Sequence, residues 1–240
     1  MKWCINHLKD PYNVEILTEE QSWRDIHLLK ESIYKWTVKF RPEIGDDAVQ
    51  YIRKKLRKDI LDPFAYFYVM PKIHKPGPKG SKTRPVSSSC NSLQQPLSKW
   101  LNEILLPFAT SQKLYINNSF EFKRDLIKTP IDPSYYIYTY DAVELYPSIS
   151  IDMCLSRIST WLENKKGIKG KLLEAICQAL EIVLKNSRLV CGDLFAKQIR
   201  GIATGTSPAT SIANLFLGIF EENEICLLYT SPSPRDQAKS

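Results

Sequence analysis

The sequence predicts an α+β fold, with helices packed on a sheet. Apolar residues recur at helical spacing in several stretches, among them Ser22 to Phe40 and Leu97 to Phe108. Short runs rich in aromatic and β-branched residues predict strands over 64–69 and 83–88 and a hairpin over 188–199. The two kinds of pattern together indicate the α+β class.

The composition is that of a globular protein. With 240 residues, 43% hydrophobic and 25% charged, the chain can bury a core. Its net charge of +7 favours polyanionic partners wherever the basic residues are concentrated. The six cysteines form no Cys-x-x-Cys pair, which argues against a zinc site or a disulfide framework and for a reducing compartment. We find neither a run of 18 apolar residues nor a signal pattern, so neither membrane insertion nor secretion is expected.

The first 60 residues are predicted to be helical. Residues 1–20 carry no clear pattern, the helix from Ser22 follows, and a second helix is capped by Asp46 or Asp47 and continues to Leu61. The second helix carries a run of basic residues: Arg53, Lys54, Lys55, Arg57 and Lys58. Such a run forms either a solvated helix face or a contact with nucleic-acid phosphates.

The segment between the first two predicted strands is basic and rich in turn residues. Its prolines and glycines predict an irregular hairpin loop over Pro71 to Ser81. From Pro71 to Arg84 there are five Lys or Arg residues and no acid. One interpretation is an exposed basic loop. The other is a stiff hairpin that fixes Lys72 and Arg84 on its two arms, where a point charge and a planar fork suit a triphosphate.

Asp141 ends the next apolar run. Residues 135–140 predict a buried strand, and Tyr146-Pro147 predicts an extended turn after it. A carboxylate at a strand end, open to solvent on one side, suits a divalent metal ion. The alternative is that Asp141 caps the helix that begins near Ser150.

The remaining elements follow from similar signals. A helix is predicted to end near Pro107, and a short one over 118–128 to open at Asn118 or Ser119. Further amphipathic helices are predicted over 151–161 and 172–184, with Asp152 as a helix-end residue. After the hairpin over 188–199, Ser207-Pro208 predicts a helix start. Before that start, Gly201 and Gly205 allow close approach of the backbone to a ligand.

Four motifs, in this order, resemble those of reverse transcriptases, most closely the enzymes of Penelope-like retroelements. They are Met70-Pro-Lys-Ile-His-Lys75, Thr83-Arg-Pro-Val86, the segment Tyr138-Thr-Tyr-Asp-Ala-Val-Glu-Leu-Tyr-Pro147, and Gln198-Ile-Arg-Gly-Ile-Ala-Thr-Gly-Thr-Ser-Pro208. The resemblance covers roughly residues 60–225. One departure lies in the last motif, where the family usually has Met-Gly-Ser-Pro-x-x-Pro and this chain has Thr204-Gly-Thr-Ser-Pro-Ala-Thr210.

The resemblance implies a right-hand polymerase with an RRM-like palm sheet and packed helices. Residues 1–60 would form an N-terminal helical region, 61–130 the fingers and 131–225 part of the palm. Residues 226–240 resemble a translated sequencing-adapter end and are expected to be an artefactual tail. The family's aromatic-x-Asp-Asp motif, expected after Asn214, does not occur in the sequence. The chain is therefore expected to be a C-terminally incomplete fragment and inactive alone, because one carboxylate cannot hold both metal ions.

The resemblance also implies an activity, RNA-directed DNA polymerisation by two-metal nucleotidyl transfer. The cofactors would be two Mg²⁺ ions, or Mn²⁺ in their place, and the partners an RNA template, a DNA primer and dNTPs. The resemblance further implies that the protein acts inside the cell, in the nucleus, where retroelements integrate. The implied residues are Asp141 for catalysis; Asp141 and Ala142 for metal; Lys72, Arg84, Tyr146, Gln198, Gly201 and Gly205 for the nucleotide; and Lys75, Arg53, Lys54 and Arg57 for nucleic acid.

Two other functions remain open at this point. The first is an RNA-directed RNA polymerase, which would have a smaller group in place of Tyr146, because a ring beside the sugar excludes a 2′-OH. The second is a non-catalytic, RRM-like nucleic-acid-binding domain, which would expose aromatic residues on its sheet face. A further alternative for Tyr146 itself is that it is one more core aromatic.

Overall fold

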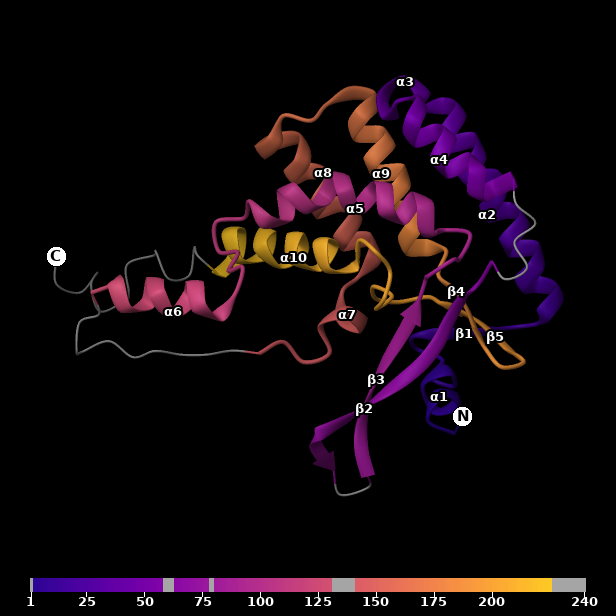
Figure 1. Cartoon of the computed structure of the whole chain (residues 1–240), viewed down its shortest axis with the longest axis horizontal. Helices are drawn as coiled ribbons and strands as arrows, with labels where there is room; N and C mark the ends of the chain where they lie inside the picture. Colours follow the sequence, from indigo (N-terminus) through magenta and orange to yellow (C-terminus); the bar gives the residue numbers. More distant parts are fainter. Residues whose placement is uncertain (1, 58–62, 78–79, 131–140, 226–240) are drawn as a thin grey trace.

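One mixed five-stranded sheet lies beside a layer of helices, and the β2–β3 hairpin projects away from that layer (Figure 1). The computed structural model describes residues 2–57, 63–77, 80–130 and 141–225. The helices are α1 Lys2–Leu8, α2 Glu19–Lys39, α3 Arg41–Ile44, α4 Asp46–Arg57, α5 Gln95–Thr110, α6 Ser119–Lys128, α7 Leu145–Ser148, α8 Ile151–Lys166, α9 Gly170–Lys185 and α10 Ala209–Phe220, which a π-helical turn Glu221–Ile225 extends. The strands are β1 Val14–Leu17, β2 Ala65–Gly77, β3 Gly80–Ser88, β4 Arg188–Cys191 and β5 Leu194–Gln198.

The sheet has the strand order β1-β5-β4-β2-β3. Neighbouring strands are antiparallel except β2 and β4, which pair in parallel with Ala65 opposite Leu189. Each of the three segments expected from the sequence contributes to this one sheet: β1 from the first, β2 and β3 from the second, β4 and β5 from the third. The chain is thus α+β, whereas its division into polymerase fingers and palm stays a prediction.

Two apolar clusters stabilise this arrangement. The larger lies within the helical layer and joins α2, α4, α5, α8, α9 and α10. At its centre the indole N–H of Trp36 donates to the Ala175 carbonyl at 3.0 Å, and the Trp36 ring meets Trp100 edge-on at 4.9 Å. In the smaller cluster, α1 packs against one face of the sheet. Its buried members are Cys4, Leu8, Ala65, Phe67, Leu189 and Ala196.

Several helices begin where the sequence places a capping residue. Thr18 and Gln21 form a capping box at the start of α2, with bonds of 3.1 and 2.8 Å. Asn118 accepts the Glu121 N–H at 3.0 Å to start α6, as the sequence predicts. Ser150 accepts the Met153 N–H at 3.4 Å and caps α8.

Most of the basic segment from Pro71 to Arg84 lies within strands β2 and β3. Strand β2 continues to Gly77 and β3 begins at Gly80, with a shift of register between the pairs Pro71–Thr83 and Pro76–Ser81. β4 pairs with β2 only at Ala65 and Tyr66, so farther along β2 one edge is free of that neighbour. An open edge tolerates residues that lack an N–H, and the prolines are accommodated there. The predicted hairpin and an irregularity within it are thus present, but the strands extend farther into 71–81 than the predicted loop allows.

Three other boundaries differ from the sequence prediction. Helix α5 continues past Pro107 to Thr110, because Leu105 and Ala109 are buried on either side of the proline. Helix α10 begins at Ala209, with Pro208 as its N-cap and no side-chain cap from Ser207. Residues 2–17, which gave no pattern, form α1 and β1. The predicted strand over 135–140 and the end of the helix expected to reach Leu61 lie outside the described residues.

Candidate functional site

The Gly-rich turn, residues 198–208 between β5 and α10, touches two segments that are far away in the sequence. Its first contact is with Tyr146 and Pro147. The Ile202 N–H donates to the Tyr146 carbonyl at 2.9 Å. At Gly201, where φ is +75°, an added Cβ would lie 2.6 Å from both the Pro147 Cα and the Tyr146 oxygen. Only glycine fits there, because both the dihedral angle and the space exclude a side chain.

The same turn is bound to strand β3. The Ser87 N–H donates to the Thr204 carbonyl at 2.6 Å, and the Thr204 hydroxyl donates to the Pro85 carbonyl at 2.7 Å. A Cβ on Gly205, where φ is +100°, would lie 2.8 Å from the Ser87 oxygen. The turn therefore connects the strand of Arg84 with the segment that follows Asp141. The close approach inferred from the two glycines is an approach to the chain's own backbone.

Arg84 and Lys72 lie on the two strands of the β2–β3 hairpin. Arg84 is opposite Met70, and Lys72 follows Pro71, where the register shift begins. Arg84 is exposed and Lys72 is half-buried. Among the residues that the structure describes, neither forms an ion pair. The exposed Arg84 is thus available to an anionic ligand on the face that carries Met70, with Lys72 two residues farther along β2.

The face of β2 on which Met70 lies opposite Arg84 carries a stripe of half-exposed apolar side chains, two of them aromatic, that the sequence interpretation missed. Tyr66, Tyr68 and Met70 are between 42% and 52% exposed, whereas Ala65 and Phe67 are buried under α1. The alternation of polar-tipped aromatics with buried residues over 65–70 was the available signal. Val86, opposite Tyr68, is also the side chain that Gly205 approaches, so the stripe borders the Gly-rich turn.

Asp141 and Ala142 are exposed and lie outside any helix or strand. Ser150 caps α8 itself, so the alternative that Asp141 caps this helix is wrong. Among the described residues, no group of three or more His, Cys, Asp or Glu side chains is arranged to hold a metal ion. Asp152 is confirmed as a helix-end residue: it lies in the first turn of α8, 3.5 Å from Lys185.

Tyr146 lies in a helical turn, and the prediction of an extended turn at Tyr146-Pro147 is wrong. The turn α7 covers Leu145–Ser148 and begins after Glu144, a non-glycine residue with φ of +51°. This left-handed residue makes the reversal that the proline was expected to make. The Tyr146 side chain is half-buried against the large core, so it combines core packing with partial access to solvent.

The Gln198 side chain forms a hydrogen bond within the Gly-rich turn. It pairs with Val14 of β1, and its side-chain amide donates to the Arg200 carbonyl at 2.9 Å. The amide is thus engaged with the backbone of the turn. Its assignment to a nucleotide stays a prediction.

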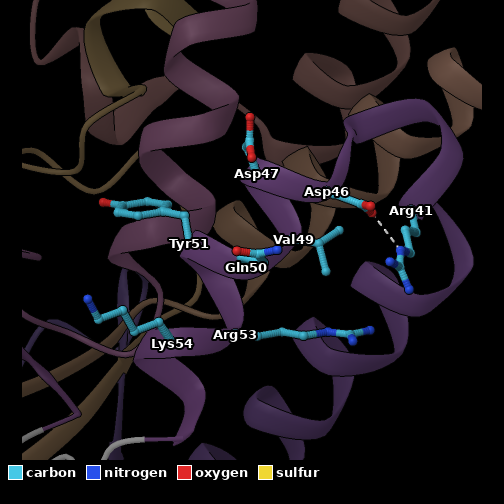
Figure 2. A pocket seen from close by; sticks show the side chains of 8 residues that line it. All are labelled: Arg41, Asp46, Asp47, Val49, Gln50, Tyr51, Arg53 and Lys54. Atoms are coloured by element: carbon cyan, nitrogen blue, oxygen red, sulfur yellow. Dashed lines mark hydrogen bonds and ion pairs between the residues drawn. The ribbon is translucent and has the colours of Figure 1, made fainter.

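The basic residues of α4 lie elsewhere in the molecule, where α4 packs on α2, α3 and α5 (Figure 1). Arg53 donates to the Thr37 hydroxyl at 2.9 Å, with its guanidinium 4.8 Å from the Tyr34 ring centre. Figure 2 shows Arg53 and Lys54 pointing to opposite sides of α4, at a surface cavity of about 690 Å³. Arg53 is therefore held by protein contacts, and Lys54 is exposed. The side chains of Arg57 and Lys75 lie outside the described part of the chain.

The acidic start of α4 shares this cavity. Asp46 accepts from the Arg41 guanidinium at 2.6 Å. This hydrogen bond, and then the charge of Arg41, hold the pKa of Asp46 below its usual value. The cavity of Figure 2 is therefore lined by both acidic and basic side chains.

No helix in the described ranges combines the length and apolar character needed to cross a membrane. Comparison with protein-family models, with curated proteins and with solved structures finds no match to this chain.

Proposed function

We propose that the chain is the nucleotide-binding portion of an RNA-directed DNA polymerase of the Penelope-like retroelement type. One observation carries the proposal: the Gly-rich turn contacts both the strand of Arg84 and the Tyr146 segment. Three of the four motifs that resemble reverse transcriptases are thereby joined by backbone contacts. Motifs that share a site must meet in the fold, and unrelated sequence coincidences have no reason to do so.

In the proposed site, each group of the nucleotide has its own partner. Arg84 and Lys72 bind the triphosphate, Arg84 through its planar fork and Lys72 as a point charge. Tyr146 lies beside the sugar, where its ring excludes a 2′-OH. The exposed ring of Tyr68 offers a stacking surface for a base, since every base has a π face. An RNA template and a DNA primer would supply the paired strand.

Mg²⁺ enters the proposal through Asp141. Its exposed carboxylate has the hard oxygen chemistry that Mg²⁺ prefers, and Ala142 can add a carbonyl oxygen. One carboxylate does not make a two-ion site, so the described residues alone do not fit the complete metal centre. When bound, the ions would stabilise charge on the transferring phosphate. The chain's own contribution is to bind and orient the nucleotide.

A second candidate is a non-catalytic nucleic-acid-binding domain. The specific observation in its favour is the half-exposed stripe of Tyr66, Tyr68 and Met70 on the sheet face. Such a stripe, next to basic residues, is typical of proteins that stack single-stranded bases. The third candidate, an RNA-making polymerase, is disfavoured by the ring of Tyr146.

The two leading functions differ in their dependence on Arg84. Mg²⁺-dNTP binding to the chain, measured by calorimetry, should weaken by about tenfold or more in Arg84→Ala, because a charge-assisted contact contributes about 1.5–3 kcal/mol. The loss should be equal for all four bases, because the contact is with phosphate. Arg124→Ala, which removes an exposed arginine of α6, is the matched control. If the wild-type chain binds single-stranded RNA through Tyr66 and Tyr68 but no dNTP, the non-catalytic function holds instead.

The metal assignment predicts a separate effect of Asp141→Asn. The substitution keeps the volume and removes the charge, so the gain in dNTP affinity on adding Mg²⁺ should disappear while binding without metal stays unchanged. Asp152→Asn, in an exposed carboxylate of α8, is the control. An equal Mg²⁺ effect in wild type and Asp141→Asn would contradict the assignment. Reading the genomic sequence after the Asn214 codon for an aromatic-x-Asp-Asp motif tests the remaining ligands.

A further inference from the structure

We infer that the N-terminal turn, residues 10–13, positions the Gly-rich turn, with Tyr12 acting through Arg200. The Arg200 guanidinium lies 4.0 Å from the centre of the Tyr12 ring, and Tyr12 is 62% exposed. A cation over an aromatic face at this distance is attracted by the ring. Arg200 immediately precedes Gly201, the residue that packs on the Tyr146 segment. Tyr12 thus restrains Arg200, the residue directly before the Gly201 contact.

The N-terminal turn is closed by its own hydrogen bonds. The Asp10 carboxylate accepts the Tyr12 N–H at 3.1 Å and the Asn13 side-chain amide at 2.6 Å. The Asp10 carbonyl accepts the Val14 N–H at 3.0 Å. These bonds satisfy the polar groups of the turn locally. The backbone that carries the Tyr12 ring is therefore held by contacts that do not involve Arg200.

Backbone contacts run alongside the ring contact. The Ile199 N–H donates to the Asn13 carbonyl at 2.9 Å, and Val14 pairs with Gln198 across β1 and β5. The Gln198 amide donates to the Arg200 carbonyl at 2.9 Å. The carbonyl of Arg200 is therefore held from β5, and its side chain is held from the N-terminal turn.

The restraint continues into the candidate site. After Arg200 come Gly201, which has no room for a side chain, and Ile202, whose N–H donates to the Tyr146 carbonyl. A displacement of Arg200 would therefore reach Tyr146 through two residues of tightly packed backbone. Tyr12 is a positioning residue for Tyr146. The part of this inference that concerns nucleotide choice depends on the proposed function; the part that concerns the turn does not.

The first test is amide hydrogen exchange at Ile202 in the folded chain. Tyr12→Leu should raise the exchange rate by about two- to fivefold, the factor that an exposed cation–π contact is worth. Tyr12→Phe keeps the ring and should exchange like wild type. Trp3→Leu removes a half-exposed aromatic from the same N-terminal segment, away from Arg200, and serves as the matched control. Arg200→Gln removes the cation and leaves the ring, so it should reproduce Tyr12→Leu.

The second test is the ratio of Mg²⁺-dNTP to Mg²⁺-rNTP affinity, which cancels any general loss of folded protein. Tyr12→Leu should shift this ratio toward rNTP, and Tyr12→Phe should restore it. Unchanged exchange at Ile202 in both Tyr12→Leu and Arg200→Gln would overturn the positioning role. If exchange responds as expected but the wild-type chain binds no Mg²⁺-nucleotide, the positioning role stands and the proposed function fails.

Discussion

At Gly201 a single residue decides whether two segments of the candidate site can meet. Its φ of +75° and the 2.6 Å that would separate an added Cβ from the Pro147 Cα are two independent obstacles to any side chain. The first can be tolerated by local strain, but the second requires the backbone of α7 to move. The position is therefore more sensitive than glycines that occupy a similar dihedral angle in open space.

Gly201→Ala should lower the free energy of unfolding by on the order of 3 kcal/mol or more, from the left-handed conformation and the clash together. Gly167→Ala is the control, because φ there is +66° and nothing lies within 4 Å of the added Cβ. It should lose only the conformational part, about 1–2 kcal/mol. Urea unfolding of both variants measures the difference. Equal losses would show that the turn and α7 separate readily.

Sequence reasoning at this scale succeeds where the signal is local. Asn118 was recognisable as a cap because a cap bonds to the backbone three residues away. Tyr12 and Arg200 were not, since a contact between residues so far apart leaves no pattern in either neighbourhood. Glu144 was also missed, because a left-handed glutamate has no sequence signature.

At the scale of elements, one ion pair joins the long helix α2 to the sheet. Arg188 opens β4 and is 8% exposed; both its Nε and one terminal nitrogen lie 2.7 Å from Asp25 on α2, which is 27% exposed. The other terminal nitrogen of Arg188 is buried and has no hydrogen-bond partner among the residues that the structure describes. The arginine is thus more dependent on the pair than the aspartate, which water can reach.

The two halves of this pair should respond unequally to substitution. Asp25→Asn leaves a buried guanidinium without a counter-charge and should cost about 2–4 kcal/mol of stability. Arg188→Met leaves a carboxylate that water can solvate and should cost about 1–2 kcal/mol. The double variant Asp25→Leu with Arg188→Met should be more stable than Asp25→Asn. Chemical denaturation of the three proteins checks the order, and a reversed order of the single variants would show that Arg188 finds another partner.

Elements were predicted well where one periodicity dominates and poorly where two signals compete. The helices α2, α8 and α9 and the β4–β5 hairpin follow their apolar spacing. In β2 the turn residues indicated a loop, but pairing with β3 was stronger, because prolines are tolerated at an open strand edge. In α5 the buried face outweighed Pro107 in the same way.

For the whole molecule, the sequence order of the motifs did not reveal which of them touch. The β2–β3 hairpin meets the Gly-rich turn at Ser87 and Thr204, and the Tyr146 segment meets the same turn at Ile202. The α+β class could be predicted, since it depends on local patterns. The strand order could not, because β1 and β5 come from opposite ends of the described chain.

The parallel pairing of β2 with β4 also determines how long β2 waits for its neighbour during synthesis. More than 120 residues separate Ala65 from Leu189, so the β2–β3 hairpin is synthesised long before its central neighbour exists. At about 5–20 residues per second, the inner edge of β2 stays uncovered for about 6–25 s. Unpaired edges of this kind are where nascent chains associate wrongly. Farther along the same hairpin, between Pro71 and Arg84, lie prolines and lysines, which are residue types that discourage edge-to-edge pairing.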